Sequence, residues 1–343
     1  MRILDVQNPS NISLLGTAVL GGDSREVVVS GNYAYIAARD SGVYVVDVTD
    51  PANPVKIKTL QTPRARGIAI NGSMVYVAAS DSGMGIIDIS NPSNPVMVGY
   101  TGSDVYGENI SVNGNVAGIT DYGQITFYDL TNPVSPIKKG STGSLSTGNE
   151  GFTIKSNYAY VPDGDSLKVF NISDLNSPAL VSKIYTGGYG YMAYVEGDYC
   201  YVASEGTGVR AINVSNPSVP VEDGYYDDVP QSRGLSANGK YVYVSEKADG
   251  LTIYSNDLVT SVDYRDLYMP ESISLSQNYP NPFNPSTNIF IELKEKTFVT
   301  LEVFNSIGQK VAVLINKELS AGSTNIIFDA SKFSTGVYYY QLT

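Results

Sequence analysis

The chain has 343 residues, enough for one large domain and one small one, and carries a net charge of −12 with only 22 lysines and arginines. So acidic a surface repels nucleic-acid phosphates and anionic lipid heads, which argues against nucleic acid and membrane as partners. The sequence has no histidine, the commonest general base and metal ligand, and no apolar run long enough to insert into a membrane. Abundant glycine (33), tyrosine (27) and proline (17) favour many short strands joined by tight turns.

A short apolar run followed by one polar residue recurs along most of the chain. The run at 43–46 and the polar turn at 49–54 are the clearest example. The polar residue between run and turn recurs at steps of 41 or 42 residues, at Asp5, Asp47, Asp88, Asp129, Asn171, Asn213 and Ser255. A period this constant indicates a repeat architecture.

Each repeat contains four strand signals with turn residues between them. In the first complete copy the pattern predicts strands a, b, c and d at 26–31, 33–38, 43–48 and 55–60. Further copies follow at 67–100, about 109–139, 151–185 and 192–226, and a last, incomplete copy at 234–255 supplies strands a to c. Four antiparallel strands in every repeat predict the blades of a β-propeller.

The two ends of the repeat region suggest how a ring would close. The N-terminus supplies strands c and d only, and the strand at 14–20 is expected to lie beside the last copy, at 233–255. We therefore predict an all-β fold in which residues 1–255 form a six-bladed propeller of four-stranded blades. Residues 3–6 and 251–255 both have the pattern of strand c, so they cannot both be strand c of one composite blade. The alternative is a longer parent protein with seven or more blades.

Three segments carry a resemblance to a known repeat. They are SGNYAYIA (30–37), VYVVDVTDPANP (43–54) and GIIDISNPSNP (85–95). The repeat resembles the LVIVD family of propeller-forming repeats, and the resemblance covers roughly residues 1–255. It implies a propeller fold and no particular reaction, because the family is defined by its repeat.

The repeat pattern stops after Ser255. Residues 256–274 are polar and irregular, as in a linker, and residues 275–343 are predicted to form a small Ig-like β-sandwich. The segment 298–305 alternates apolar and polar residues like a half-buried strand, and turns are expected at 306–309, 321–322 and 335–336.

Five motifs in this last region occur in a specific order: YPNPFNPST (279–287), VFNSIGQKV (303–311), SAG (320–322), FDAS (328–331) and GVYYYQL (336–342). They resemble the type A C-terminal sorting domain of type IX secretion, and an ordinary Ig-like accessory domain is the alternative. The motif residues we single out are Tyr279, Pro280, Asn281, Pro282, Phe283, Asn284, Pro285, Gly308, Gln309, Gly336 and Tyr338.

The sorting-domain resemblance implies a partner and a location. The partner is the type IX secretion machinery, and the protein is expected outside the cell or at the outer-membrane surface after passing through the periplasm. Domains of this family have one more strand, with a basic end, after the position of Thr343. The sequence does not contain this strand, and no signal peptide is visible at its start. We therefore expect it to be a fragment of a longer protein.

Several recurring features are predicted to serve the scaffold. The polar residue of each repeat is expected to accept backbone N–H bonds from its own c–d loop. The alternating tyrosines of strand b, such as Tyr33 and Tyr35, are expected to pack between blades, with sugar stacking as the alternative. Cys200 is expected to be buried and unreactive. The acidic side chains of the b–c turns are expected to be solvated, and we predict no cofactor. A calcium ion bound in one of these turns is the alternative.

A candidate binding site appears when the blades are aligned on their a–b turns. The residue just before strand a, next to the channel, is in order Arg25, Arg66, Glu108, Glu150, Tyr191 and Arg233. In a closed ring the three arginines form one positive arc opposite the two glutamates. Because guanidinium groups match carboxylates, an anion site is the functional interpretation, and a mutually neutralising ring that plugs the channel is the alternative.

We favour a non-catalytic, monomeric propeller that binds an extracellular protein or glycan or serves as a scaffold. A sialidase-like hydrolase is one alternative, since its chemistry needs Arg for a substrate carboxylate, Tyr as nucleophile and Glu as base. Sialidase Asp-box repeats and their tryptophan are absent from the sequence. A passive surface stalk is the third interpretation.

Overall fold

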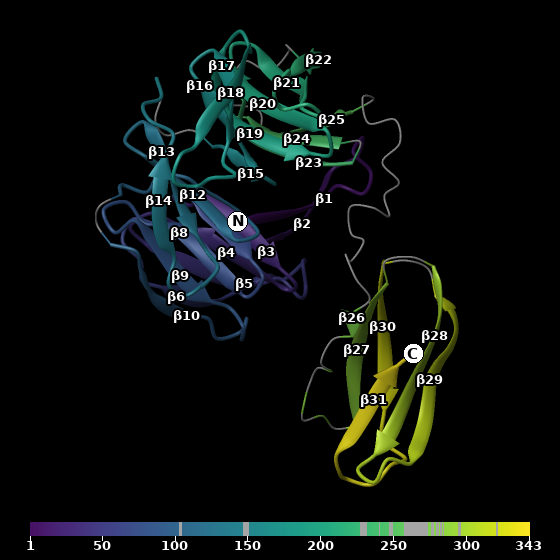
Figure 1. The fold of residues 1–343 in the computed structure, drawn as a ribbon. Coiled ribbons are helices and arrows are strands. Elements are labelled where there is room, and N and C mark those ends of the chain that lie inside the picture. The colour runs from purple at the N-terminus through teal and green to yellow at the C-terminus, as the bar shows by residue number, and fades with distance from the viewer. Residues whose placement is uncertain are drawn as a thin grey trace. The chain divides into compact units, whose positions relative to one another are not determined.

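The structure is a computed structural model of the whole chain (Figure 1). It describes residues 1–102, 105–146, 151–226, 232–239, 241–246, 250–256, 274–275, 278, 281, 283, 285–293, 296–319 and 322–343. The chain divides into two compact units, Met1–Leu258 and Val259–Thr343. Regular structure in the described ranges is β-strand throughout, and these ranges contain no helix that could span a membrane.

Five four-stranded antiparallel sheets, which we name blades 1 to 5, make up most of the described part of the first unit. In each sheet the strands follow one another in chain order as a, b, c and d. The strands are β3 (Glu26–Ser30), β4 (Tyr33–Ala37), β5 (Val43–Asp47) and β6 (Val55–Leu60) in blade 1; β7 (Ile68–Asn71), β8 (Met74–Ala78), β9 (Met84–Asp88) and β10 (Val96–Tyr100) in blade 2; β11 (Ile110–Asn113), β12 (Val116–Asp121), β13 (Gln124–Asp129) and β14 (Ile137–Ser141) in blade 3; β15 (Thr153–Lys155), β16 (Tyr158–Asp163), β17 (Ser166–Asn171) and β18 (Ala179–Tyr185) in blade 4; and β19 (Tyr189–Glu196), β20 (Tyr199–Glu205), β21 (Gly208–Asn213) and β22 (Val221–Tyr226) in blade 5.

Two smaller sheets complete the first unit. Strands β23 (Ser232–Asn238), β24 (Tyr241–Glu246) and β25 (Gly250–Ser255) form a three-stranded sheet, blade 6, and β1 (Arg2–Asp5) and β2 (Ser13–Thr17) form a hairpin. The a strands of successive blades lie beside one another from β3 through to β23. Successive sheets that meet at their first strands are the arrangement of a β-propeller, so the predicted fold class is confirmed, while the number of blades in a closed ring stays a prediction.

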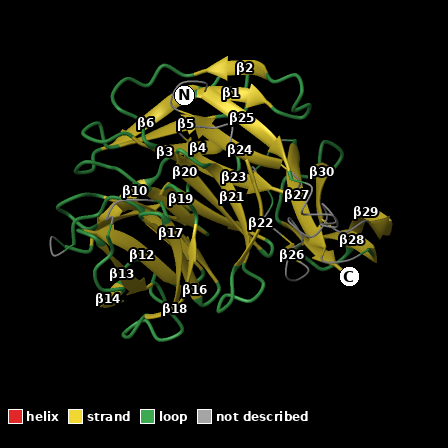
Figure 2. Cartoon of the chain, turned by 90° about the horizontal axis from the view of Figure 1, so that it is seen from above, coloured by secondary structure: helices red, strands yellow, loops and turns green. Residues whose placement is uncertain are grey.

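The expected closure of the ring differs from the pairing in the structure. Among the described residues β2 pairs only with β1, and β25 pairs only with β24. The N-terminal strand therefore does not extend the last sheet. The reason is that β1 and β25 both have the sequence of a strand c, and each keeps its own partner. The hairpin lies between blade 6 and blade 1 in both views (Figures 1 and 2).

The repeated polar residue shapes the loop between strands c and d. The Oδ1 atom of Asp47 accepts a hydrogen bond from the Thr49 backbone N–H at 2.9 Å. The same bond recurs in the other blades, from Ser90 to Asp88, Thr131 to Asp129, Ser173 to Asn171 and Ser215 to Asn213. Asn can replace Asp without loss of this hydrogen bond, because both side chains have an acceptor oxygen at the Oδ1 position. The scaffold role predicted for this position is confirmed.

The hydrophobic core of the first unit lies between blades. Tyr35 packs with Ile68 and Val75 of blade 2, and Tyr76 packs with residues of blade 3. Tyr160 and Tyr201 take the same position in the interfaces that follow. These tyrosines are at most 3% exposed, so the predicted packing role is confirmed for them, while the first tyrosine of strand b, such as Tyr33, is only half-buried. Cys200 is fully buried as predicted, and this burial raises the pKa of its thiol.

The second unit contains two three-stranded sheets among its described residues, β26-β27-β30 and β29-β28-β31. They enclose one hydrophobic cluster that includes Ile289, Leu301 and Phe328. The Ig-like topology stays a prediction. The strands are β26 (Ser274–Leu275), β27 (Ser286–Leu293), β28 (Thr297–Asn305), β29 (Lys310–Leu319), β30 (Gly322–Asp329) and β31 (Tyr338–Leu342).

Parts of the predicted linker and sorting motif fall outside the described residues. Between 256 and 274 only the two end residues, Asn256 and Ser274, are described. Tyr279, Pro280, Pro282 and Asn284 of the sorting motif also lie outside the described residues. Of the remaining motif residues, Phe283 and Tyr338 contact the ring of Phe328 in the core, and Gly308 turns the chain between β28 and β29 with a positive φ of 79°.

Candidate functional site

A cavity of about 750 Å³ lies among the inner strands of the first unit. Five of the six residues that the sequence places before strand a line this cavity: Arg25, Arg66, Glu108, Tyr191 and Arg233. The sixth, Glu150, lies outside the described residues. One position of the repeat thus brings side chains from five blades to the same cavity, although the residue there is arginine in three blades, glutamate in one and tyrosine in one.

Tyr191 and Arg233 reach the cavity from within strands. The pairing of β19 with β20 shifts register between Gly190 and Met192, and that of β23 with β24 shifts between Ser232 and Gly234. Each residue therefore occupies a β-bulge, a device that redirects one side chain of a strand. Sequence periodicity placed these two residues before their strands, and the structure corrects this detail, because a bulge leaves no simple mark in the sequence.

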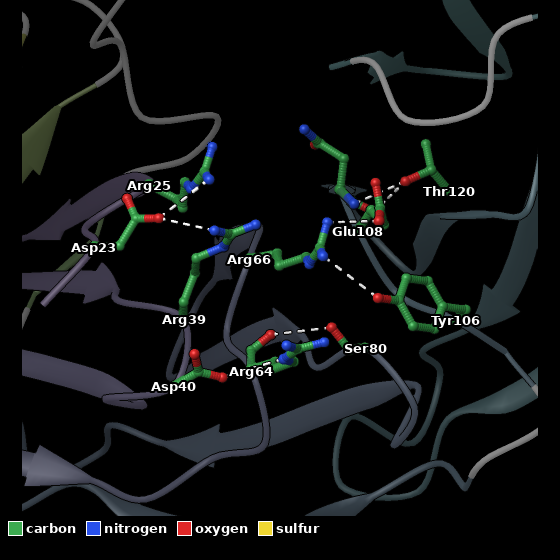
Figure 3. Close-up of polar contacts among 11 residues, drawn as sticks. Asp23, Arg25, Arg39, Asp40, Arg64, Arg66, Ser80, Tyr106, Glu108 and Thr120 are labelled. Carbon is green, nitrogen blue, oxygen red and sulfur yellow. Dashed lines mark hydrogen bonds and ion pairs between the residues drawn. The ribbon is translucent and has the colours of Figure 1, made fainter.

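One arginine of the predicted arc is neutralised (Figure 3). The Nη1 atom of Arg66 lies 2.5 Å from Oε1 of Glu108, and Nη2 donates to the Tyr106 hydroxyl at 3.3 Å. Both charged side chains are largely buried, at 22% and 13% exposure. This pair joins the starts of blades 2 and 3 and agrees with the interpretation of these residues as a charge ring.

A second cluster at the cavity, Asp23, Arg25 and Arg39, carries more positive than negative charge. Asp23 accepts hydrogen bonds from Arg25 at 3.1 Å and from Arg39 at 3.0 Å, so one carboxylate serves two guanidinium groups (Figure 3). These pairs are about half exposed, and solvent and salt weaken such contacts. Arg39 was not among the residues predicted to line the channel. Its location in the b–c turn was the available signal, since these turns share a face with the d–a loops.

Arg233 has a different environment. Its guanidinium group lies over the ring of Tyr191, 4.0 Å from the centroid, and the Tyr191 hydroxyl donates to the carboxylate of Glu205. Within the described residues no ion pair involves Arg233, and its side chain is exposed. Stacking uses the flat face of a guanidinium group, so its N–H edges can still donate to a planar carboxylate.

Glu26 lines the same cavity and joins blade 1 to blade 2. One of its carboxylate oxygens accepts the backbone N–H of Ile68 at 2.9 Å, and burial raises the pKa of Glu26 to about 7. The residue thus carries only part of a negative charge at neutral pH. Within the described part of the chain no cluster of three or more His, Cys, Asp or Glu side chains is placed to hold a metal ion.

Comparison with known families matches both units. The LVIVD repeat matches residues 21–62, 64–101, 151–186, 187–228 and 231–254. The secretion system C-terminal sorting domain matches residues 277–343. Blade 3 lies outside the repeat matches, yet it forms the same four-stranded sheet as its neighbours. A search of curated proteins found no match.

Solved structures share the fold at low sequence identity. A chain of the mitotic checkpoint complex is 13% identical, with a TM-score of 0.58 over 73% of this chain and 81% of that one. The β-propeller domain of Cps50 (Swd1) from Myceliophteria thermophila is 13% identical, with a TM-score of 0.54 over 70% and 85%. The computationally designed Ika8 protein is 11% identical, with a TM-score of 0.53 over 92% and 87%.

These structural similarities establish the propeller architecture alone, since their identities are so low. The family matches go further, because the LVIVD matches together cover more than half of the residues. The chain therefore belongs to the LVIVD repeat family, and behind its repeats it carries a secretion system C-terminal sorting domain that indicates export by type IX secretion.

Proposed function

We propose that the protein is an exported, non-catalytic binding module that holds an acidic group of an extracellular protein or glycan in the cavity of its propeller. The sorting domain indicates export to the cell surface or the extracellular space, and a repeat propeller fits a binding or scaffold module. The cavity supplies the chemistry for the ligand class, because positively charged side chains from several blades meet there.

The observation that carries this proposal is the excess of guanidinium groups at the cavity. Arg25 and Arg39 share one carboxylate, and no described carboxylate pairs with Arg233. The whole chain has a net charge of −12, so a positive site stands out from an acidic surface and would attract anions locally. Arg66 is already paired with Glu108 and is expected to position the wall of the site.

Replacing both Arg25 and Arg233 by alanine is expected to weaken binding of carboxylate-bearing ligands by about tenfold or more for each arginine, because each removes a charge-assisted contact. Binding of the full chain to an array of acidic and neutral glycans and peptides measures this. Arg64→Ala is the matched control, since Arg64 pairs with Asp40 outside the cavity lining. Equal binding by the double variant and the control would refute the anion site.

Deleting residues 277–343 is expected to stop delivery to the surface and to leave the propeller in the periplasm of the host that produces it. The sorting domain is the part that the secretion machinery recognises, whereas the described interblade clusters of the first unit consist of residues of that unit. Cell fractionation with an antibody against the propeller measures the location. Normal surface delivery of the truncated protein would contradict the sorting role.

The hydrolase alternative draws on one contact, the hydrogen bond from the Tyr191 hydroxyl to Glu205 beside Arg233. A sialidase-like site also needs several arginines that converge on one substrate carboxylate. Arg66 is engaged by Glu108 and Arg25 by Asp23, which favours binding over hydrolysis. Release of product from fluorogenic sialosides, lost on Tyr191→Phe, would replace the binding proposal with the hydrolase. Binding of no acidic ligand at all would favour a passive stalk.

A further inference from the structure

A pair of tyrosines lies on the face of the propeller that carries the b–c turns and the d–a loops. Tyr122 is in the b–c turn of blade 3, and Tyr106 is in the loop that leads into this blade. Their ring centroids are 4.9 Å apart with 32° between the ring planes, so one face of Tyr122 packs on Tyr106. Tyr122 is nevertheless 78% exposed, and neither tyrosine lines the cavity described above. The pair is therefore a separate aromatic surface that faces solvent.

The turn itself does not require an aromatic residue at Tyr122. The equivalent positions of blades 1, 2 and 4 are occupied by Arg39, Ser80 and Gly164. All four residues have a positive φ, between 42° and 63°. Glycine adopts this conformation without strain, whereas a bulky side chain adopts it at a cost. Because the ring of Tyr122 is also exposed, the folding of this turn does not account for it.

The charged side chains that act on Tyr122 are carboxylates. Partial desolvation and the charge of Asp81 raise the pKa of the Tyr122 hydroxyl, and two further carboxylates, Asp121 and Glu108, add to this effect. Glu108 already has the ion pair described above, and Asp121 is buried and accepts a backbone N–H of the preceding loop at 2.9 Å. Asp81 is exposed, and no hydrogen bond or ion pair among the described residues engages its carboxylate. The negative charge beside the ring is therefore open to a ligand.

Several other tyrosines of the first unit carry a cationic side chain over the ring. The pairs are Lys56 with Tyr44, Arg66 with Tyr106, Arg210 with Tyr225 and Arg233 with Tyr191, at 4.0 to 5.6 Å from the ring centroid. The negative face of an aromatic ring attracts a cation at this range. Within the part of the chain that the structure describes, no lysine or arginine lies over Tyr122. Its open face thus has the surroundings of a cation site that no described side chain fills.

We propose that Tyr122 and Asp81 form a second binding site, which takes an arginine side chain of a partner protein. The flat guanidinium group stacks on the open face of Tyr122 and donates its N–H groups to the Asp81 carboxylate. The two residues belong to the b–c turns of neighbouring blades, so they meet a ligand from the same face. The net charge of −12 favours a basic partner. This site is independent of the proposed anion site, because both residues lie outside the cavity lining.

The substitution Tyr122→Trp makes the site observable by fluorescence, because the chain has no tryptophan of its own. The full chain with this substitution is titrated at low salt with acetyl-Gly-Arg-Gly-amide. The matched ligand is the same peptide with citrulline, in which an uncharged urea of almost the same shape replaces the guanidinium group. We expect a saturable change in emission with the arginine peptide and about tenfold weaker binding of the citrulline peptide. Added salt should weaken the arginine complex.

Two further substitutions, each made in the Tyr122→Trp chain, test the role of the carboxylate. Asp81→Asn removes the charge of the proposed site and is expected to weaken binding of the arginine peptide about fivefold. Asp198→Asn removes another exposed carboxylate, in the a–b turn of blade 5, and is expected to bind the peptide normally. The pair of variants has the same net charge, so it separates a local contact from general attraction to an acidic protein.

Equal affinity for the arginine and citrulline peptides, equal binding by the Asp81→Asn and Asp198→Asn variants, or no saturable binding would each overturn the inference. A saturable response to the neutral sugar cellohexaose, without one to the arginine peptide, would overturn it in favour of a glycan platform. Failure of the anion site would show in the variant that lacks Arg25 and Arg233, and failure of the arginine site would show in Asp81→Asn. The two proposals therefore stand or fall separately.

Discussion

Replacing Tyr76 by alanine is expected to lower the free energy of unfolding of the propeller by about 3–5 kcal/mol. The ring of Tyr76 has no exposed surface and lies between blades 2 and 3 with Ile110 and Leu130. Its hydroxyl also donates to the backbone carbonyl of Pro133 at 3.1 Å. The variant would lose the interblade contacts and leave a cavity between two sheets.

Urea unfolding of the full chain, followed by circular dichroism, measures this loss. The matched control is Tyr185→Ala on β18, where the tyrosine is 65% exposed and the change should stay within about 0.5 kcal/mol. Similar losses in the two variants would show that the interblade tyrosines do not hold the propeller together.

Replacing Glu26 by glutamine is expected to raise stability above pH 7 and to leave it unchanged below about pH 4.5. Burial raises the pKa of Glu26 from 4.5 to about 7, so the folded protein binds this proton more tightly than the unfolded chain. The contribution of this proton to the free energy of unfolding is therefore fully present below about pH 4.5 and is lost as the pH rises to about 7. Glutamine keeps an oxygen for the Ile68 N–H without this loss.

Denaturant unfolding between pH 4 and pH 8 tests the effect, which should be on the order of 2 kcal/mol at pH 8. A difference between wild type and Glu26→Gln that is the same at every pH would mean that Glu26 does not titrate in this range.

The strands of complete repeats were predictable because their signals are local and repeated. Strand c of blade 1 was expected at 43–48 and occupies Val43–Asp47, and strand d occupies Val55–Leu60 as predicted. The role of Asp47 was predictable for the same reason, since its hydrogen bond closes a loop two residues away. Turn residues, alternation and period act over a few positions, so the pattern at each copy reinforces the others.

The details of the cavity were less predictable, because they depend on neighbours that are distant in sequence. The alignment brought Arg25 and Arg66 to one cavity, but it could not tell that Asp23 would serve both Arg25 and Arg39. The β-bulges at Tyr191 and Arg233 arise where two strands of a hairpin differ in length by one residue. The hairpin β1–β2 forms its own sheet because β1, like β25, has the sequence of a strand c, and each keeps its own partner.

The interblade location of the core has a consequence for local opening. Each described hydrophobic cluster of the first unit is shared by two neighbours, so a sheet with a neighbour on both sides must break two interfaces to separate. Among the described residues, blade 6 shares a hydrophobic cluster with blade 5 only. Amide hydrogens should therefore exchange slowest in β8, β12 and β16, and much faster in β24 and β25. Local opening of the propeller is expected to begin at blade 6.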